Sequence, residues 1–162
     1  MTIFSTLANF NPWVNAHIYD AVATLADEEY RRDEGLFFGS IHRTLNHILV
    51  VDRLWFCRVQ GVKPDVKSLD QILFNDFDQL RAGRQAEDQQ IIDIVSGFDL
   101  DALSEEVSFI TTDGRQGQLP RAHMLMAVFN HQTHHRGQVT ALLSKFGADY
   151  DDIDLPYYLA SV

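Results

Sequence analysis

The sequence lacks the features of secreted and membrane-spanning proteins. Of its 162 residues only one is a cysteine, Cys57, so no disulfide can form within the chain. No apolar run approaches the roughly 20 residues that span a bilayer. Residues 1–10 lack the basic start and the long apolar core of a secretory signal. We therefore expect a cytoplasmic protein that does not enter a membrane, with Cys57 as a small hydrophobic residue rather than a nucleophile.

Basic residues are also scarce. The chain has 13 lysines and arginines against 23 aspartates and glutamates, and its formal net charge is -10 at pH 7. Proteins that bind nucleic acids or anionic lipid surfaces neutralise phosphates with clustered lysine and arginine. The charge balance therefore argues against both classes of partner.

Hydrophobic residues make up 46% of the chain, which is enough for the core of one domain over residues 1–162. Apolar residues recur every three or four positions in four long stretches, which is the pattern of helices with a buried face. Ser40 and Gly61 suit the start and end of the second stretch, and Pro120 and Gly147 suit those of the fourth. The predicted helices cover residues 1–26, 41–60, 76–97 and 120–146.

Breaks in these patterns locate the remaining elements. Pro12 interrupts the first pattern, so we expect that helix to kink or to restart there. Residues 98–104 are predicted to form a connection. Residues 106–119 are β-prone on either side of Asp113-Gly114, which is typical of a hairpin with a type I′ turn. The sequence therefore predicts an all-α four-helix bundle with a small β-hairpin before the last helix.

Two short apolar segments lie outside the predicted helices. Gly35 and Gly39 bracket the rings of Phe37 and Phe38, which we expect to be tucked against the bundle. An acidic tail follows Gly147 and ends in aromatic residues at 157–159. We expect the acidic part to be solvated and the aromatic part to pack on a groove or on a second subunit.

The longest helical stretch carries the run Asn130-His131-Gln132-Thr133-His134-His135-Arg136-Gly137-Gln138. Residues four apart share a helix face, so His131 and His135 point the same way, on the face that packs inward. Two such imidazoles can bind one divalent metal, although they can equally be satisfied core or surface histidines. His134 is a competing partner for His131, but its own face is small and partly polar. We therefore place His134 at the rim.

A third candidate ligand lies in the stretch 41–60, which is apolar on most sides. His47 sits in the middle of this stretch, where an unpaired polar group is costly. A metal shared with His131 and His135 would give His47 a partner, and so would a backbone or carboxylate hydrogen bond. Three protein ligands with a fourth position open to water mark a reactive metal site. Without a metal, the three histidines would form a hydrogen-bonded cluster in the core.

Two parts of the sequence carry a family signature. The first is Thr44-Leu45-Asn46-His47-Ile48-Leu49 with Asp52-Arg53-Leu54-Trp55, and the second is His131-x3-His135-Arg136-Gly137-Gln138. Together they resemble the DinB/YfiT-like family of metal-dependent proteins, and the resemblance covers nearly the whole chain. It implies a four-helix bundle, usually a homodimer, with a divalent metal on His47, His131 and His135.

The resemblance implies more than one reaction. Some relatives are thiol-dependent transferases or isomerases that use bacillithiol, mycothiol or glutathione, and others are called hydrolases. We therefore expect an enzyme whose open metal position activates a low-molecular-weight thiol or water toward a small-molecule substrate. Zn or Ni is the favoured metal, with Fe, Mn or Cu as alternatives, because imidazole binds all of them. The alternative is a non-catalytic metal-binding or stress-response protein, which a fourth ligand such as His134 or His17 would favour.

Residues beside the candidate ligands have several possible roles. Arg136 and Gln138 could orient ligands, bind a substrate or be structural. Gly137 could let another helix approach closely. Asp52 and Arg53 are expected to form surface or interhelical ion pairs rather than to act in catalysis. No glutamate forms a His-Glu-x2-His arrangement, so the general base of a metalloprotease is missing.

Overall fold

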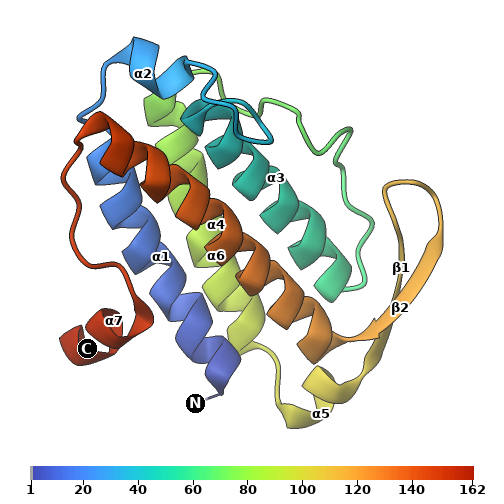
Figure 1. Ribbon diagram of the computed structural model, residues 1–162. Coiled ribbons are helices and arrows are strands. Elements are labelled where there is room, and N and C mark those ends of the chain that lie inside the picture. The colour runs from blue at the N-terminus through green and yellow to red at the C-terminus, as the bar shows by residue number, and fades with distance from the viewer. Residues whose placement is uncertain (1) are drawn as a thin grey trace.

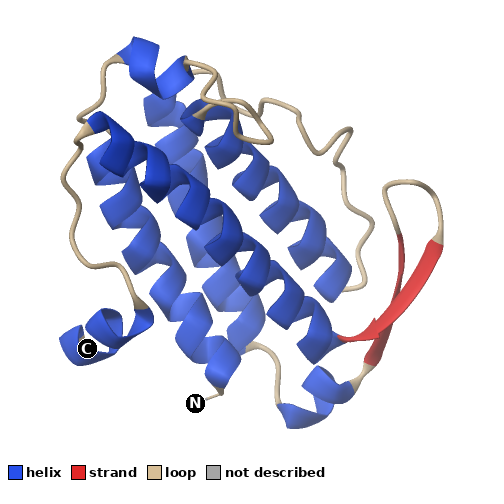
Figure 2. Ribbon diagram, in the orientation of Figure 1, coloured by secondary structure: helices blue, strands red, loops and turns tan. Residues whose placement is uncertain are grey.

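The computed structural model describes residues 2–162, so Met1, which we placed in the first helix, lies outside the described residues. Four long helices dominate it, as Figure 2 shows, and the prediction of a four-helix bundle with a hairpin before the last helix is confirmed. In chain order the elements are α1 (Ile3–Val22), α2 (Asp27–Arg31), α3 (Ile41–Val59), α4 (Phe77–Ser96), α5 (Leu100–Ser104), β1 (Glu106–Ile110), β2 (Gln116–Pro120), α6 (Arg121–Phe146) and α7 (Leu155–Ser161).

The long helices are not arranged in simple up-and-down order. In Figure 1, α1 and α6 run in one direction while α3 and α4 run in the other. The connection 60–76 makes this possible because it returns along the length of α3 before α4 begins. Each of α1 and α3 packs against both α4 and α6. Helix α6 therefore lies between α1 and α3 and packs against a different helix on each side.

Local capping explains where the helices begin and end. The Ser40 side chain accepts a hydrogen bond from the backbone N–H of Arg43 at the start of α3, and Asp76 does the same for Gln79 at the start of α4. Gly147 ends α6 in the left-handed conformation, at φ 70°. These limits agree with the predicted ones to within a residue or two. Within residues 2–162, no helix is both long and apolar enough to cross a bilayer.

The structure corrects three details of the helical prediction. The first helix neither restarts nor divides at Pro12, and it ends at Val22 rather than at residue 26. Proline removes one backbone hydrogen bond, but packing against α4 and α6 holds the helix together. The predicted connection 98–104 contains the short helix α5, which Asp99 caps through the N–H of Ala102. The tail forms α7, whose Tyr158 ring packs on Phe10 of α1.

The hairpin is confirmed, but its predicted turn type is wrong. A type I′ turn needs positive φ at both central residues. Among residues 2–162 no residue other than glycine has a positive φ, and in this loop only Gly114 does, at 85°. The N–H of Gly114 bonds the carbonyl of Thr111, and the N–H of Thr111 bonds the carbonyl of Arg115. The loop is therefore the longer kind in which one left-handed glycine follows the turn, so Asp113 keeps an ordinary conformation.

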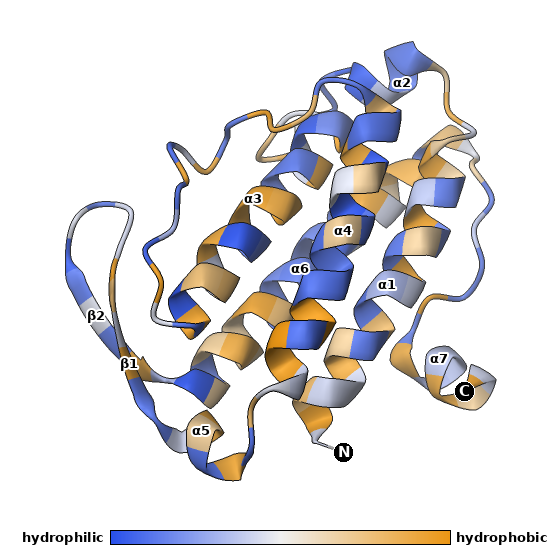
Figure 3. Ribbon diagram, turned by 180° about the vertical axis from the view of Figure 1, so that it is seen from behind, coloured by the Kyte–Doolittle hydropathy of each residue, from blue (hydrophilic) through white to orange (hydrophobic). Residues whose placement is uncertain are grey.

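The core consists of two hydrophobic clusters with polar side chains between them. One cluster lies toward α2 and includes Ile18, Leu49 and Leu143, and the other lies toward the hairpin and includes Phe56 and Val128. Figure 3 shows hydrophobic and hydrophilic residues alternating along each helix, as expected for helices that bury one side. We call the buried polar residues between the clusters the polar layer: Asn11, Asn15, Asp52, Arg84, Asp88, Gln132 and Arg136.

The polar layer is centred on the guanidinium of Arg84. Arg84 Nη1 lies 2.5 Å from Asp52 Oδ2, and Arg84 Nη2 lies 2.9 Å from Asp88 Oδ1. Asn11 Nδ2 donates to Asp88 Oδ1 at 2.7 Å, and Arg136 Nη1 donates to Asn11 Oδ1 at 2.7 Å. Burial raises the pKa of Asp52, and the charge of Arg84 opposes that rise. The layer thus joins residues from all of the long helices in one network.

The polar layer gives a stability prediction. Replacing Arg84 by Met should lower the free energy of unfolding by about 3–5 kcal/mol, because it leaves two buried carboxylates without their cation. Arg115→Met is the matched control, since Arg115 pairs with Asp113 at the exposed hairpin loop and its loss should cost less than about 0.5 kcal/mol. Urea unfolding followed by circular dichroism measures both. Equal costs for the two variants would contradict a structural role for the layer.

Candidate metal centre

The structure brings together the three histidines selected from the sequence. His47 comes from the middle of α3, and His131 and His135 lie one turn apart on α6. These two helices pack against each other, and one ring nitrogen from each of the three histidines lies within 4.8 Å of the other two. His47 and His135 are buried, and His131 is half-buried. The three-histidine group thus needs both the four-residue spacing of His131 and His135 on α6 and the packing of α6 against α3.

A backbone carbonyl fixes the tautomer of His47. His47 Nδ1 lies 2.7 Å from the carbonyl oxygen of Leu69, in the connection that returns along α3. Because a carbonyl can only accept, Nδ1 carries the proton, and the lone pair of Nε2 faces the other histidines. This contact with Leu69 could not be predicted from the sequence, since a main-chain acceptor has no side-chain signature.

Gln138 fixes the tautomer of His135 in the same way. The amide oxygen Oε1 of Gln138 lies 2.8 Å from His135 Nδ1, so Nδ1 donates and the lone pair of Nε2 is free. The amide nitrogen of Gln138 lies 3.4 Å from Nε2 of His134, which can accept its proton. His134 is exposed, as placed from the sequence, and is not part of the three-histidine group.

His131 is the residue whose polar atoms are least satisfied. Its Nε2 lies 3.0 Å from Nε2 of His47, and its buried Nδ1 has no hydrogen-bond partner within residues 2–162. Burial lowers the pKa of His131 to about 3 and that of His47 to about 4, and burial also lowers the pKa of His135. All three imidazoles are therefore neutral near pH 7, and the neutral form is the one that binds metals.

The donor set fits a divalent cation better than a hydrogen-bonded cluster. Within such a cluster, His131 can donate to His47, but Nε2 of His135 would keep an unused lone pair. A cation can use one lone pair from each of the three histidines. Imidazole nitrogens bind Zn, Ni, Cu and Fe, and a set of three histidines does not by itself select among these metals.

Phe38 closes one side of the histidine group. Its ring stacks on His47, with 3.7 Å between ring centroids and 22° between planes, and its edge faces His135 at 5.7 Å. The expectation that both rings of the 36–38 segment are tucked in holds for Phe38 only, since Phe37 is 86% exposed. A groove of about 460 Å³ is lined by Phe38, Arg43 and Asp70, and none of the three histidines is among its lining residues.

The structure places the remaining histidine candidate away from this group. Nδ1 of His17 lies 2.8 Å from the carbonyl of Trp13, and its Nε2 lies 3.8 Å from Asp151. His17 is partly exposed and faces the tail rather than α3. No fourth histidine, cysteine or carboxylate joins the group within residues 2–162.

Other predictions about neighbouring residues were mixed. Asp52 and Arg53 form interhelical ion pairs with Arg84 and Glu87, as expected. The prediction for Gly137 was wrong, because a Cβ atom added there would have no atom within 4 Å. Cys57 is only half-buried, and burial raises the pKa of its thiol, so it is not an activated nucleophile.

Comparisons with known proteins agree with this architecture. The model of the DinB family matches residues 1–161. The chain is 27% identical over 167 residues to Protein DinB of Bacillus subtilis strain 168, which covers 94% of this chain and 91% of that protein.

Two solved structures share the fold, each at less than 25% identity. A DinB-like protein of Bacillus cereus has a TM-score of 0.66 and 20% identity, over 86% of this chain and 90% of that one. YfiT of Bacillus subtilis has a TM-score of 0.65 and 15% identity, over 92% and 91% of the two chains. YfiT is described as a probable metal-dependent hydrolase with an unusual four-helix bundle topology.

The histidine group gives a prediction about metal content. Protein purified without a histidine tag should hold about one divalent metal per chain, and His131→Ala should lose it because two ligands bind metals far more weakly than three. His134→Ala is the matched control on the same helix and should keep the metal. Elemental analysis by mass spectrometry measures all three proteins. A wild type that takes up neither Zn nor Ni would contradict the metal site.

A second prediction concerns the side chain that orients His135. Gln138→Leu removes the acceptor for Nδ1–H and should weaken metal affinity by about 10- to 100-fold. Gln138→Glu keeps an acceptor at the same place and should recover most of the loss. Competition with a coloured chelator gives the affinities. If Gln138→Leu matched the wild type, the contact with His135 would have no part in metal binding.

Proposed function

This chain belongs to the DinB family, and we propose that it is a divalent-metal enzyme whose metal is held by His47, His131 and His135. The observation that carries the proposal is the convergence of three neutral imidazoles without a fourth protein ligand in residues 2–162. A closed structural site normally has four protein ligands, whereas a catalytic site has three and keeps a position open. The description of YfiT as a probable metal-dependent hydrolase supports the same proposal.

The metal would supply Lewis-acid chemistry, lowering the pKa of a water or thiol toward neutrality. The protein's own contribution is to hold the three imidazoles in their metal-binding form. Leu69 and Gln138 keep the protons of His47 and His135 on Nδ1. Buried surroundings keep the imidazoles neutral, so protons compete weakly for the nitrogen lone pairs.

The groove lined by Phe38 is the proposed place for the body of the substrate, since Phe38 also stacks on His47 and so joins the groove to the histidine group. The Phe38 ring covers His47 and excludes water from that side. The groove beyond it combines the exposed ring of Phe37 with the charged side chains of Arg43 and Asp70. A groove of this volume and mixed polarity suits a small molecule with an apolar part. We therefore propose a small-molecule substrate, with a low-molecular-weight thiol or water as the activated partner.

The remaining expectations about partners belong to the same proposal. A net charge of -10 argues against a nucleic-acid or anionic-membrane partner. We propose that the enzyme acts as a homodimer in the cytoplasm. Zn or Ni is the proposed metal, with Fe, Mn or Cu as alternatives that the ligand set also accepts.

The proposed function predicts metal-dependent turnover. Zn- or Ni-loaded wild type should transfer a small thiol to an electrophilic acceptor, or hydrolyse an ester or amide. His131→Ala should fall to the rate without enzyme, and His134→Ala should retain activity because it leaves the three ligands in place. A panel of both substrate types, assayed with and without chelator, measures this.

The absorption spectrum of cobalt-loaded protein distinguishes the proposed enzyme from a non-catalytic metal-binding protein. A thiol that binds the metal should add a charge-transfer band near the ultraviolet edge of the cobalt spectrum. Protein that binds metal stoichiometrically, but shows neither turnover nor any spectral response to thiols or substrates, would overturn the enzymatic proposal. It would instead support a non-catalytic metal-binding or stress-response protein.

A further inference from the structure

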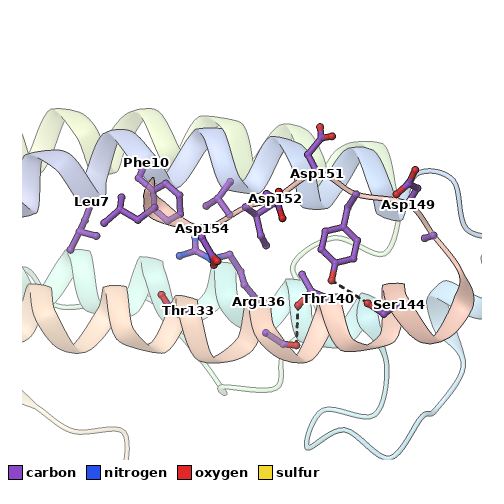
Figure 4. Close-up of a pocket in the computed structure, with 16 residues that line it drawn as sticks. Leu7, Phe10, Thr133, Arg136, Thr140, Ser144, Asp149, Asp151, Asp152 and Asp154 are labelled. Atoms are coloured by element: carbon purple, nitrogen blue, oxygen red, sulfur yellow. Dashed lines mark hydrogen bonds between the residues drawn. The ribbon is translucent and has the colours of Figure 1, made fainter. Parts of the chain in front are cut away.

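A large cleft lies on the face of α6 opposite the histidines. Its volume is about 850 Å³, and it is enclosed by α1, α6 and the tail segment 148–155 (Figure 4). Thr133, Gly137 and Thr140 line it from α6. At 3.6 residues per turn these positions lie on the side of α6 away from His131 and His135. The cleft is therefore separate from the candidate metal centre.

A buried arginine reaches the floor of this cleft. Arg136 extends from α6 toward α1 (Figure 4), and only 6% of its surface is exposed. Its Nη1 donates to Asn11 at 2.7 Å. Its Nε and Nη2 have no hydrogen-bond partner in residues 2–162, and no carboxylate there lies within ion-pair distance of the guanidinium. A buried guanidinium with free donors is a strong site for a carboxylate.

The rest of the cleft presents acceptors and apolar surface. The hydroxyl groups of Thr133 and Thr140 donate to backbone carbonyls of their own helix, so only their lone pairs are left for a ligand. Apolar side chains form the wall on the α1 side, among them Leu7 and Phe10. The tail segment contributes carboxylates at the mouth, of which Asp154 points toward α6 (Figure 4).

We propose that this cleft binds a small zwitterion with an apolar body, such as an amino acid or a short apolar peptide. Its carboxylate would meet Arg136, its ammonium group would meet Asp154 and the threonine oxygens, and its body would lie on Leu7 and Phe10. A simple anion meets repulsion from the acidic mouth, and a simple cation meets Arg136. A ligand with both charges matches the donors inside and the acceptors outside. The site does not depend on the proposed metal function.

Calorimetry with one dipeptide and two blocked forms tests the charge requirement. Leucyl-leucine should bind to the full-length protein. Its C-terminal amide, which lacks the carboxylate, and its N-acetyl form, which lacks the ammonium group, should each bind about thirtyfold more weakly or worse, because each leaves one charge of the site unpaired. Binding should be the same for metal-loaded and metal-free protein. Equal affinities for all three peptides, or no binding heat with any of them, would overturn the proposal.

Two substitutions at Gly137 test whether the ligand binds in the cleft. Gly137→Leu should abolish binding, since a side chain there points into open space and fills the cleft without a clash. Gly137→Ala is the matched control and should bind as the wild type does, and neither variant should change metal content. Both should fold, because glycine is the poorer helix former. Unchanged binding in Gly137→Leu would place the ligand elsewhere and overturn the proposal.

A third substitution tests the mouth of the cleft. Asp154→Asn should weaken leucyl-leucine and should not weaken the N-acetyl form, because only the ammonium group meets Asp154 and the N-acetyl anion is repelled by its charge. The competing arrangement has Asp154 itself paired with Arg136. A double-mutant cycle with Asp154→Asn and Arg136→Met, read by urea unfolding without peptide, detects such a pair because each substitution removes one of its charges. Strong coupling in that cycle would overturn the proposal, since Arg136 would already have its carboxylate.

Discussion

The ion pair of Arg84 with Asp52 and Asp88 is the interaction that fixes how the long helices stand against one another. Apolar contacts are non-directional, so the hydrophobic clusters alone would tolerate a helix that slides by a turn. Arg84 pairs with Asp52 of α3, and hydrogen bonds from Asp88 through Asn11 to Arg136 extend the network to α1 and α6, so these directional contacts oppose such a slip. Asp52 lies little more than one turn after His47 on α3, and Arg136, which bonds Asn11, follows His135 directly on α6. The register set by the polar layer is therefore also the register that places His47 opposite His131.

The chain topology supplies the other requirement of the histidine group. Because α3 and α4 run in the same direction, the connection between them must return along the bundle. That connection carries the carbonyl of Leu69 to His47 and the backbone of residues 73 and 74 to Asn46. A bundle with a short turn at this point would have no acceptor for Nδ1 of His47. The tautomer needed for metal binding is thus a consequence of the helix order.

Helix α6 separates two kinds of chemistry because it lies between α3 and α1. The face toward α3 carries three converging lone pairs and suits a cation. The face toward α1 carries a buried guanidinium with free donors and suits a carboxylate. Arg136 follows His135 directly, yet a step of one residue turns the side chain by more than a quarter of a turn. His135 therefore faces the histidine group, whereas Arg136 faces the cleft beside α1. Hydrogen bonds through Asn11 to Asp88 connect Arg136 to the rest of the polar layer.

The sequence by itself determined the features that depend on local spacing. Helix limits followed from Ser40, Gly61 and Gly147, and the shared face of His131 and His135 followed from the helical repeat, since each involves only neighbouring residues. Tertiary structure alone decided the acceptor of His47, the stacking of Phe38 and the open surroundings of Gly137. It also placed charged residues of α4, among them Arg84 and Asp88, in the centre of the core. These features join residues far apart in the chain, and no local pattern encodes which partners the packing will bring together.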